Sequence, residues 1–217
     1  MIKRISILVL TYNHEKFIQK CIDSILSQEV EAELEIIVGE DCSSDNTAQI
    51  LNDHYGNAKV ELIVREKNIG ASLNFLDIIS QCTGDYIAYI DGDDYMLPGK
   101  LAAQLKVFDE NPIINLVHHN VSEVNFSNDI VKKVKFKGCL EGDINKLLLN
   151  CQGGIQSCSI MVKRNKDLNW EKLIPKDSKI QDMPFIYNSL GVGNIAYINK
   201  PLSAYRKHST SITSVTG

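Results

Sequence analysis

The chain has 217 residues, a length that suits one sizeable domain able to bury a hydrophobic core. Hydrophobic residues make up 44% of it and charged residues 23%, the proportions of an ordinary globular protein. The formal net charge of −4 argues against general nucleic-acid binding, which needs a basic surface.

The sequence shows no pattern typical of a membrane span or a secretion signal. The apolar run that follows Met1 is short, and no stretch reaches about 18 apolar residues. The six cysteines form no C-x-x-C pair and have no flanking His cluster, which favours unpaired thiols in a reducing compartment over zinc or disulfides. We therefore expect a cytoplasmic protein, and we leave open a peripheral contact with the inner face of the cell membrane.

The first half of the chain alternates predicted strands with predicted helices. Strands are expected at 4–11, 33–39, 59–66 and 85–90. Helices are expected at 14–28, 44–56, 71–82 and 98–110, the last opened by Pro98. Because strand and helix repeat three times, the pattern predicts a doubly wound α/β fold, with a mainly parallel central sheet flanked by helices.

The second half is less regular. Strands are expected at 115–124, 130–138, 157–164, 194–199 and 201–208, and helices at 143–150 and 182–191. No linker, internal repeat or low-complexity segment separates this half from the first. We therefore expect a single domain over residues 1–217.

Polar segments follow the predicted strands at the edge where open α/β sheets bind ligands. They are TYN at 11–13, EDCSSD at 40–45, REKNIGAS at 65–72 and DGDD at 91–94. The last segment offers carboxylates that suit Mg²⁺ or Mn²⁺, and Gly92 would let the backbone approach a ligand closely. Taken alone, an Asp-x-Asp pattern is explained better by a solvated turn before the next helix.

Six segments, taken in order, resemble the family 2 glycosyltransferases, which have the GT-A fold. They are ISILVLTYNHEKFIQKCIDSILSQ, EIIVGEDCSSDNT, NIGASLN, GDYIAYIDGDDYMLPGKL, KIQDMPFIYNSL and YRKHSTSIT, and they span about residues 4 to 211. The resemblance implies a Rossmann-like nucleotide-sugar-binding half at about 1–112. It also implies a smaller β-containing half at about 113–217 that binds the acceptor and carries the catalytic base.

The resemblance also implies an activity, namely inverting transfer of a sugar from a nucleotide-diphosphate donor to a hydroxyl of a glycan or lipid-linked acceptor. A divalent metal, Mn²⁺ or Mg²⁺, would sit on the diphosphate. Surface polysaccharide biosynthesis is the implied setting. The donor base, commonly uracil, stays open because Glu40 and Cys42 replace the usual Asp and Gly of the second polar segment.

Site residues follow from the same resemblance and from the polar segments around it. The positions expected to bind the nucleotide sugar are Thr11, Tyr12, Asn13, Glu40, Asp41, Asn68, Asp91, Gly92 and Arg206, the last through phosphate oxygens. Asp93 is expected to ligate the metal, and His208 is a second candidate ligand. Asp182 is the expected general base, although an N-cap role for the following helix also fits its position.

Two other functions stay open at this point. A sugar nucleotidyltransferase would also use carboxylates and a metal, but it usually needs a glycine-rich loop after the first strand, and LTYNHEKF contains no glycine. A non-catalytic nucleotide-sugar-binding module would need neither Asp182 nor a metal. The acceptor and the oligomeric state do not follow from the sequence.

Overall fold

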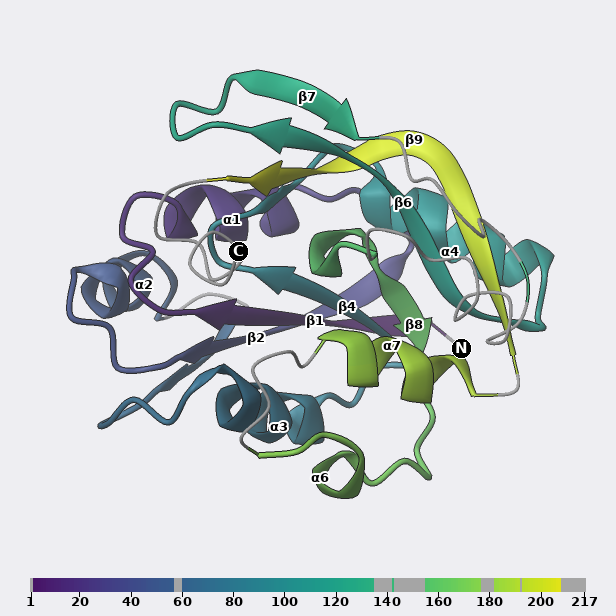
Figure 1. Cartoon of the computed structure of the whole chain (residues 1–217), viewed down its shortest axis with the longest axis horizontal. Helices are drawn as coiled ribbons and strands as arrows, with labels where there is room; N and C mark the ends of the chain where they lie inside the picture. Colours follow the sequence, from purple (N-terminus) through teal and green to yellow (C-terminus); the bar gives the residue numbers. More distant parts are fainter. Residues whose placement is uncertain are drawn as a thin grey trace.

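The structure is a computed structural model that describes residues 2–56, 60–134, 142, 155–176, 182–191 and 193–207. Within these ranges the side chains of residues 171, 182 and 183 are not part of the description. Figure 1 shows a curved sheet through the middle of the molecule, with helices on both of its faces.

The first half of the chain builds a parallel sheet and the helices that cover it. Its strands are β1 (Lys3–Thr11), β2 (Ala32–Glu40), β3 (Val60–Val64) and β4 (Tyr86–Asp91). Its first helices are α1 (Ile18–Leu26), α2 (Thr47–Tyr55) and α3 (Ala71–Gln81). β1 pairs in parallel with both β2 and β4, and β2 pairs in parallel with β3. Leu10 aligns with Gly39 on one side and Asp91 on the other, so the polar segments leave the sheet at one edge.

The second half extends the sheet with mixed pairing. It adds β5 (Tyr95–Met96), β6 (Ile114–Val124), β7 (Ile130–Val134), β8 (Met161–Lys163) and β9 (Asn194–Arg206). It also contains α4 (Lys100–Glu110), α6 (Trp170–Leu173), α7 (Asp182–Leu190) and a 3₁₀ turn at Ser157–Ser159. The described strands follow the order β3-β2-β1-β4-β8-β6-β9-β5, with β7 paired to β6. The central sheet and its flanking helices confirm the predicted α/β fold class.

Several predicted boundaries were wrong. The strands expected at 194–199 and 201–208 are the single strand β9, which runs through Pro201 because the register against β6 shifts on both sides of that residue. The strand expected at 157–164 begins with the 3₁₀ turn and is extended only over β8. α1 begins at Ile18 and α4 at Lys100, later than expected, and β5 and α6 are too short to show a period. The helix expected at 143–150 lies outside the described residues.

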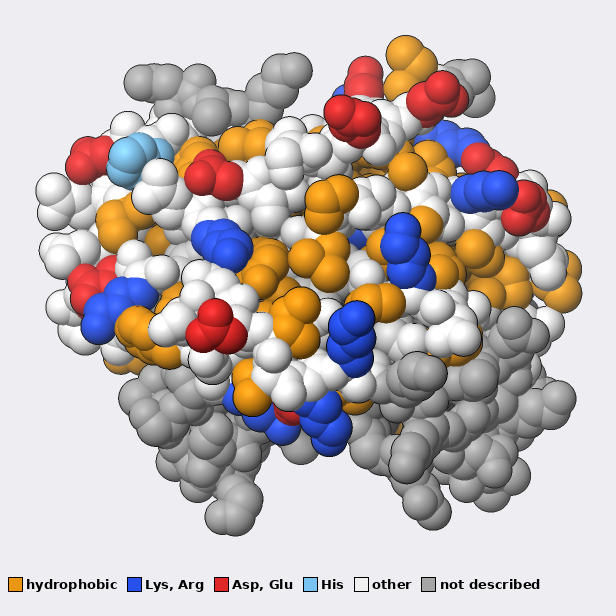
Figure 2. Space-filling model, turned by 90° about the horizontal axis from the view of Figure 1, so that it is seen from above, with side chains coloured by type: hydrophobic (Ala, Val, Ile, Leu, Met, Phe, Trp, Pro, Cys, Tyr) orange, Lys and Arg blue, Asp and Glu red, His pale blue; other side chains and the backbone are white. Residues whose placement is uncertain are grey.

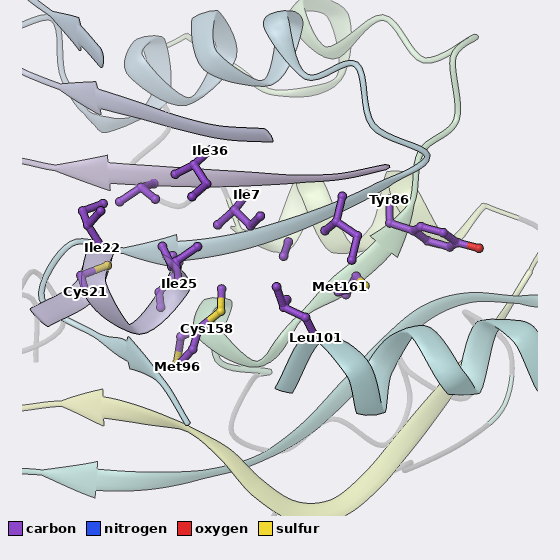
Figure 3. Close-up of a cluster of buried hydrophobic side chains, with 14 of the residues drawn as sticks. Ile7, Cys21, Ile22, Ile25, Ile36, Tyr86, Met96, Leu101, Cys158 and Met161 are labelled. Carbon is purple, nitrogen blue, oxygen red and sulfur yellow. The ribbon is translucent and has the colours of Figure 1, made fainter. Parts of the chain in front are cut away.

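The core consists of two layers, one on each face of the sheet. Ile7 and Val9 of β1 pack toward α1 and α4, whereas Leu8 and Leu10 pack toward α3 and α7. Both faces of β1 are therefore buried, which explains its unbroken apolar sequence. Figure 3 shows the first layer, in which side chains of α1, β1 and β2 meet those of α4 and β8.

The cysteines and helices of the described ranges add two findings. Cys21, Cys42, Cys82 and Cys158 are free thiols, while Cys139 and Cys151 lie outside the description.

None of the helices in the described ranges combines the length and the hydropathy that a membrane crossing requires.

Lys100, the first residue of α4, is a buried charged group within the core. Its side chain is fully buried, and Nζ has no hydrogen-bond partner among the described residues. Burial lowers the pKa of Lys100 to about 8. His119 on β6 faces the same region, and its own burial, together with the neighbouring Lys100, lowers the pKa of His119 well below its usual value.

We expect Lys100 to make the protein more stable as the pH rises. Between pH 8 and pH 10.5 the unfolded chain keeps the Lys100 proton and the folded chain loses it, so the free energy of unfolding increases with pH. The gain is about 2 kcal/mol from pH 7.5 to pH 9.5. Urea unfolding of the wild type and of Lys100→Met measures it, because the variant should lack this rise. Parallel pH profiles for the two proteins would contradict the expectation.

Candidate active site

The residues DGDD at 91–94, called the acidic turn below, begin at the last residue of β4. Asp91 Oδ1 accepts a hydrogen bond from the Tyr89 hydroxyl at 2.8 Å, and Asp91 Oδ2 accepts one from Ser157 Oγ at 2.9 Å. Both carboxylate oxygens are thus oriented, one by β4 itself and one by the 3₁₀ turn. Ser157 was not predicted as a site residue, because it lies 66 positions from Asp91 and belongs to no recognisable motif.

Gly92 brings the acidic turn against the end of β1. Its amide donates to Leu10 O at 2.7 Å. A Cβ at this position would lie 2.7 Å from Thr11 Oγ1 and 2.9 Å from His14 Nδ1, both closer than side chains normally approach. The backbone at Gly92 is therefore packed closely against the end of β1, and its expected contact with a nucleotide sugar stays a prediction.

Asp93 and Asp94 are held from the opposite side by β9. The backbone amide of Arg206 donates to Asp94 Oδ1 at 2.7 Å, and Arg206 Nε donates to the Asp93 carbonyl at 2.8 Å. The two residues differ in exposure, since Asp94 is buried and Asp93 is half-buried. Asp93 is thus the more accessible of the two for a ligand, and its role as a metal ligand stays a prediction.

The electrostatics of the acidic turn favour a cation. Burial, together with the neighbouring carboxylates of Asp93 and Asp91, raises the pKa of Asp94 well above its usual value. Asp94 is buried, and the Cys158 thiol is close enough to interact with its carboxylate. Carboxylate oxygens are the ligands that Mg²⁺ and Mn²⁺ prefer, so the donor set fits such an ion.

The described residues nevertheless do not complete a metal site by themselves. They contain no group of three or more His, Cys, Asp or Glu side chains arranged to hold a metal ion. His208, the second candidate ligand, lies outside the described residues. The acidic turn therefore fits an ion that also takes oxygens from a substrate, as Mg²⁺ often does with phosphates.

Arg206 makes a different set of contacts from the expected phosphate contact. Its side chain is 2% exposed, and besides Asp93 O it donates to Asn125 O at 2.6 Å and to Asn128 Oδ1 at 2.7 Å. The guanidinium carbon also lies 4.4 Å from the centre of the Phe17 ring. These contacts make Arg206 a clamp that joins the acidic turn to the loop between β6 and β7.

Glu40 and Asp41 shape the loops beside the acidic turn. The Glu40 carboxylate is 1% exposed and accepts from the amides of Cys42 and Ser43. The Asp41 carboxylate is 3% exposed and accepts from the amides of Ile69 and Gly70, each at 2.8 Å. Their oxygens are directed at protein amides, so a loop-forming role explains both side chains where a ligand contact was expected.

Asn68 adds a further contact between the same loops, because its side-chain amide donates to the Asp41 carbonyl at 3.0 Å. Asn68 itself is exposed at the surface. The loop that precedes α3 is thereby fastened to the end of β2. Asn68, which is one of the residues predicted to bind the nucleotide sugar, is therefore accessible to a ligand.

The segment after β1 leaves an aromatic side chain exposed at the same edge. Thr11 is buried, and its Oγ1 lies 3.2 Å from His14 Nδ1. Asn13 adopts a left-handed φ of 57°, and its Oδ1 accepts from the amide of Ser44 at 2.8 Å. Between them Tyr12 is 45% exposed, so its ring could stack on a base.

The predicted general base, Asp182, is the first residue of α7. Phe185, one turn into that helix, packs edge-on against Tyr89 with ring centroids 6.4 Å apart and against Phe75 at 5.5 Å. Tyr89 in turn donates to Asp91. A short chain of contacts therefore ties the start of α7 to the acidic turn.

Comparison with known families identifies one that matches most of the chain, namely Glycosyl transferase family 2, over residues 6–167. A similar protein is an uncharacterized protein of Mycobacterium tuberculosis, 29% identical over 212 residues, which cover 95% of this chain and 60% of the relative. The chondroitin synthase of Pasteurella multocida is 34% identical over 121 residues, covering 56% of this chain and 12% of the synthase. The chain thus spans less than two thirds of the length of these relatives.

Similar solved structures have the same architecture. The crystal structure of Staphylococcus aureus TarS 1-349 in complex with UDP superposes with a TM-score of 0.74 at 20% identity, covering 95% of this chain and 61% of that one. The TarS 1-349 complex with UDP-GlcNAc gives a TM-score of 0.73 at 20% identity, covering 97% and 60%. The family match covers more than half of the chain, and the fold agrees with it. This chain therefore belongs to glycosyl transferase family 2.

Proposed function

We propose that this glycosyltransferase moves a sugar, with inversion, from a UDP-sugar to a hydroxyl of a glycan or lipid-linked acceptor. The observation that carries the proposal is the acidic turn, fixed by Tyr89, Ser157 and Arg206 at the carboxyl edge of the parallel strands. The similar TarS structures contain UDP or UDP-GlcNAc, which supports a uridine donor.

We assign the donor to the space beside the acidic turn. Tyr12 would stack on the base, Asn68 would contact the nucleotide from the neighbouring loop, and Asp91 would accept from the ribose. Asp93 would ligate a divalent ion, and Asp94 keeps no assigned role. When bound, that ion supplies positive charge that neutralises the departing diphosphate.

The acceptor would approach from the side of α7. Inversion requires a base on the face of the sugar opposite the leaving group, and the Asp182 carboxylate would take the proton of the acceptor hydroxyl. Residues after about 113 would form the acceptor side, and His208 is a further candidate at the diphosphate. The similarity to polysaccharide synthases supports a role in building a surface polysaccharide.

Donor binding tests this proposal directly. UDP and UDP-sugars should bind the wild-type chain more tightly with Mn²⁺ than with EDTA. Asp93→Ala should weaken the Mn²⁺-dependent binding at least ~10-fold, because losing even an outer-shell partner of a metal has effects of that size. Isothermal titration measures the Kd, and a thermal-shift screen against UDP-, GDP- and dTDP-sugars identifies the base.

A matched control is Asp53→Ala, which removes an exposed carboxylate from α2, away from the acidic turn. It should bind UDP and Mn²⁺ like the wild type. If no nucleotide diphosphate binds in a Mn²⁺-dependent way, or if Asp93→Ala binds as well as Asp53→Ala, the assignment of Asp93 is wrong.

A further inference from the structure

The hairpin of β6 and β7 carries a cluster of exposed apolar side chains. Phe126 is 53% exposed, Ile130 is 59% exposed and Val131 is 68% exposed, all within six positions of the chain. β7 is an edge strand, which pairs with β6 along one side only among the described strands. Large apolar groups gathered at one exposed site indicate an interaction surface, whereas single ones do not.

Lysines surround these apolar side chains. Lys132 and Lys133 are exposed on β7 itself, and Lys16 Nζ lies 5.1 Å from the centre of the Phe126 ring. We call Phe126, Ile130, Val131, Lys132 and Lys133 the β7 patch. Figure 2 looks onto the side of the molecule that carries β7 and shows hydrophobic side chains lying among Lys and Arg side chains, with Asp and Glu side chains between them.

The charge of the β7 patch is opposite to that of the whole protein. β7, with the sequence IVKKV over Ile130–Val134, contains two exposed lysines and no acidic residue, although the chain has a net charge of −4. The nearest acidic residue in the loop, Asp129, accepts a hydrogen bond from the side chain of Asn125. A local basic surface on an acidic protein favours a partner with dense negative charge.

A second copy of the chain does not fit the exposed edge of β7 well. Antiparallel pairing of two β7 strands about Lys132 would place each Lys132 opposite its counterpart, and like charges directly opposite are destabilising. Lysines on a margin strand commonly prevent such pairing. The partner must therefore contact both the lysines and the apolar side chains next to them.

The β7 patch is also connected to the candidate active site. The Arg206 guanidinium donates to the carbonyls of Asn125 and Phe126 and to that of Asp93. In Figure 1 the turn between β6 and β7 lies on the side toward which the arrows of β1 and β4 point. Whatever binds the β7 patch is therefore brought beside the acidic turn.

We propose that the β7 patch docks this protein onto the surface of an anionic lipid membrane. Because successive side chains of a strand point to opposite faces, β7 meets the membrane with its free edge. Lys132 and Lys133 then contact the lipid headgroups, and Ile130 and Val131 enter the boundary between headgroups and acyl chains. Basic residues next to apolar ones are the combination that binds such surfaces peripherally. Docking in this orientation holds the acidic turn next to the membrane surface. The proposal rests on the exposed side chains alone and does not require the proposed function.

Vesicle co-sedimentation tests the proposal without any measurement of activity. The wild-type chain should bind vesicles of phosphatidylglycerol and phosphatidylcholine, bind pure phosphatidylcholine vesicles weakly, and dissociate as salt is raised. Lys132→Ser with Lys133→Ser should weaken binding at least ~10-fold. Ile130→Ser with Val131→Ser should weaken it to a similar extent and leave its salt dependence unchanged.

The matched control is Ile113→Ser with Lys106→Ser, which removes one exposed apolar and one exposed basic side chain elsewhere. It should bind vesicles like the wild type, and the thermal unfolding of all variants should be alike. The proposal is overturned if the wild type does not bind anionic vesicles, or if the β7 variants bind these vesicles as well as the control does. It is also overturned if the wild type is a dimer that Val131→Ser dissociates. Loss of UDP binding with vesicle binding intact would affect only the proposed function.

Discussion

Asp182→Asn is expected to lower the kcat of sugar transfer about 10²–10⁴-fold, the usual effect of removing a general base. The Kd for UDP and Mn²⁺ should stay near the wild-type value, because the donor binds at the acidic turn and its neighbouring loops rather than at α7. An asparagine amide cannot accept the proton of the acceptor hydroxyl at neutral pH. Single-turnover kinetics with a saturating donor separate this chemical step from binding.

The choice of asparagine also distinguishes a base from a helix cap. Asn is as good an N-cap residue as Asp, so a cap-only role for Asp182 predicts normal turnover and normal stability in Asp182→Asn. Asp167→Asn, which changes an exposed carboxylate in the loop after β8, is the matched control. Unchanged transfer by Asp182→Asn would exclude Asp182 as the base, whereas loss of transfer at unchanged Tm would support it.

The contacts of α7 explain why Asp182 is a reasonable base. Phe185 packs against Tyr89, and Tyr89 donates to the Asp91 carboxylate. A base must be within hydrogen-bond reach of the acceptor hydroxyl, so the position of α7 against β4 matters as much as the identity of residue 182. Phe75 and Trp170 also pack on Phe185 and help to fix that position.

Local patterns in the sequence predicted the strands that position the acidic turn. β1 and β4 are apolar on both faces because both are buried, and their parallel register aligns Leu10 with Asp91. The carboxylates were therefore predicted at the correct edge of the sheet. What local pattern cannot reveal is which side chain reaches them from a distant part of the chain.

Ser157 and Arg206 illustrate this limit. The Ser157 side chain contacts Asp91 across 66 positions, and the backbone amide of Arg206 contacts Asp94 across 112 positions, so no local period could indicate either contact. Glu40 and Asp41 show the converse, since two acidic residues at a strand end suggest ligand contacts. Their neighbours Ser43 and Gly70 present amides that turn the carboxylates inward.

The contacts of Arg206 give the second large expected effect. Arg206→Ala removes the donor from several partly buried oxygens and the packing of a buried side chain, and we expect the free energy of unfolding to fall by about 3 kcal/mol. Arg206→Lys keeps the positive charge, but a single ammonium cannot reach Asp93 O, Asn125 O and Asn128 Oδ1 together. We therefore expect Arg206→Lys to lose part of this stability as well. Urea unfolding followed by circular dichroism measures both losses.

The same variants decide between a clamp and a phosphate ligand at position 206. A clamp predicts that Arg206→Lys, measured where it is fully folded, binds UDP normally in EDTA but loses part of the Mn²⁺-dependent gain, because Asp93 is no longer held. A direct phosphate contact predicts normal stability and weaker UDP binding even in EDTA. Arg164→Lys is the matched control, since Arg164 also donates to backbone carbonyls, those of Thr83 and Gly84, on a different part of the protein. It should lose stability while its Mn²⁺-dependent UDP binding stays normal.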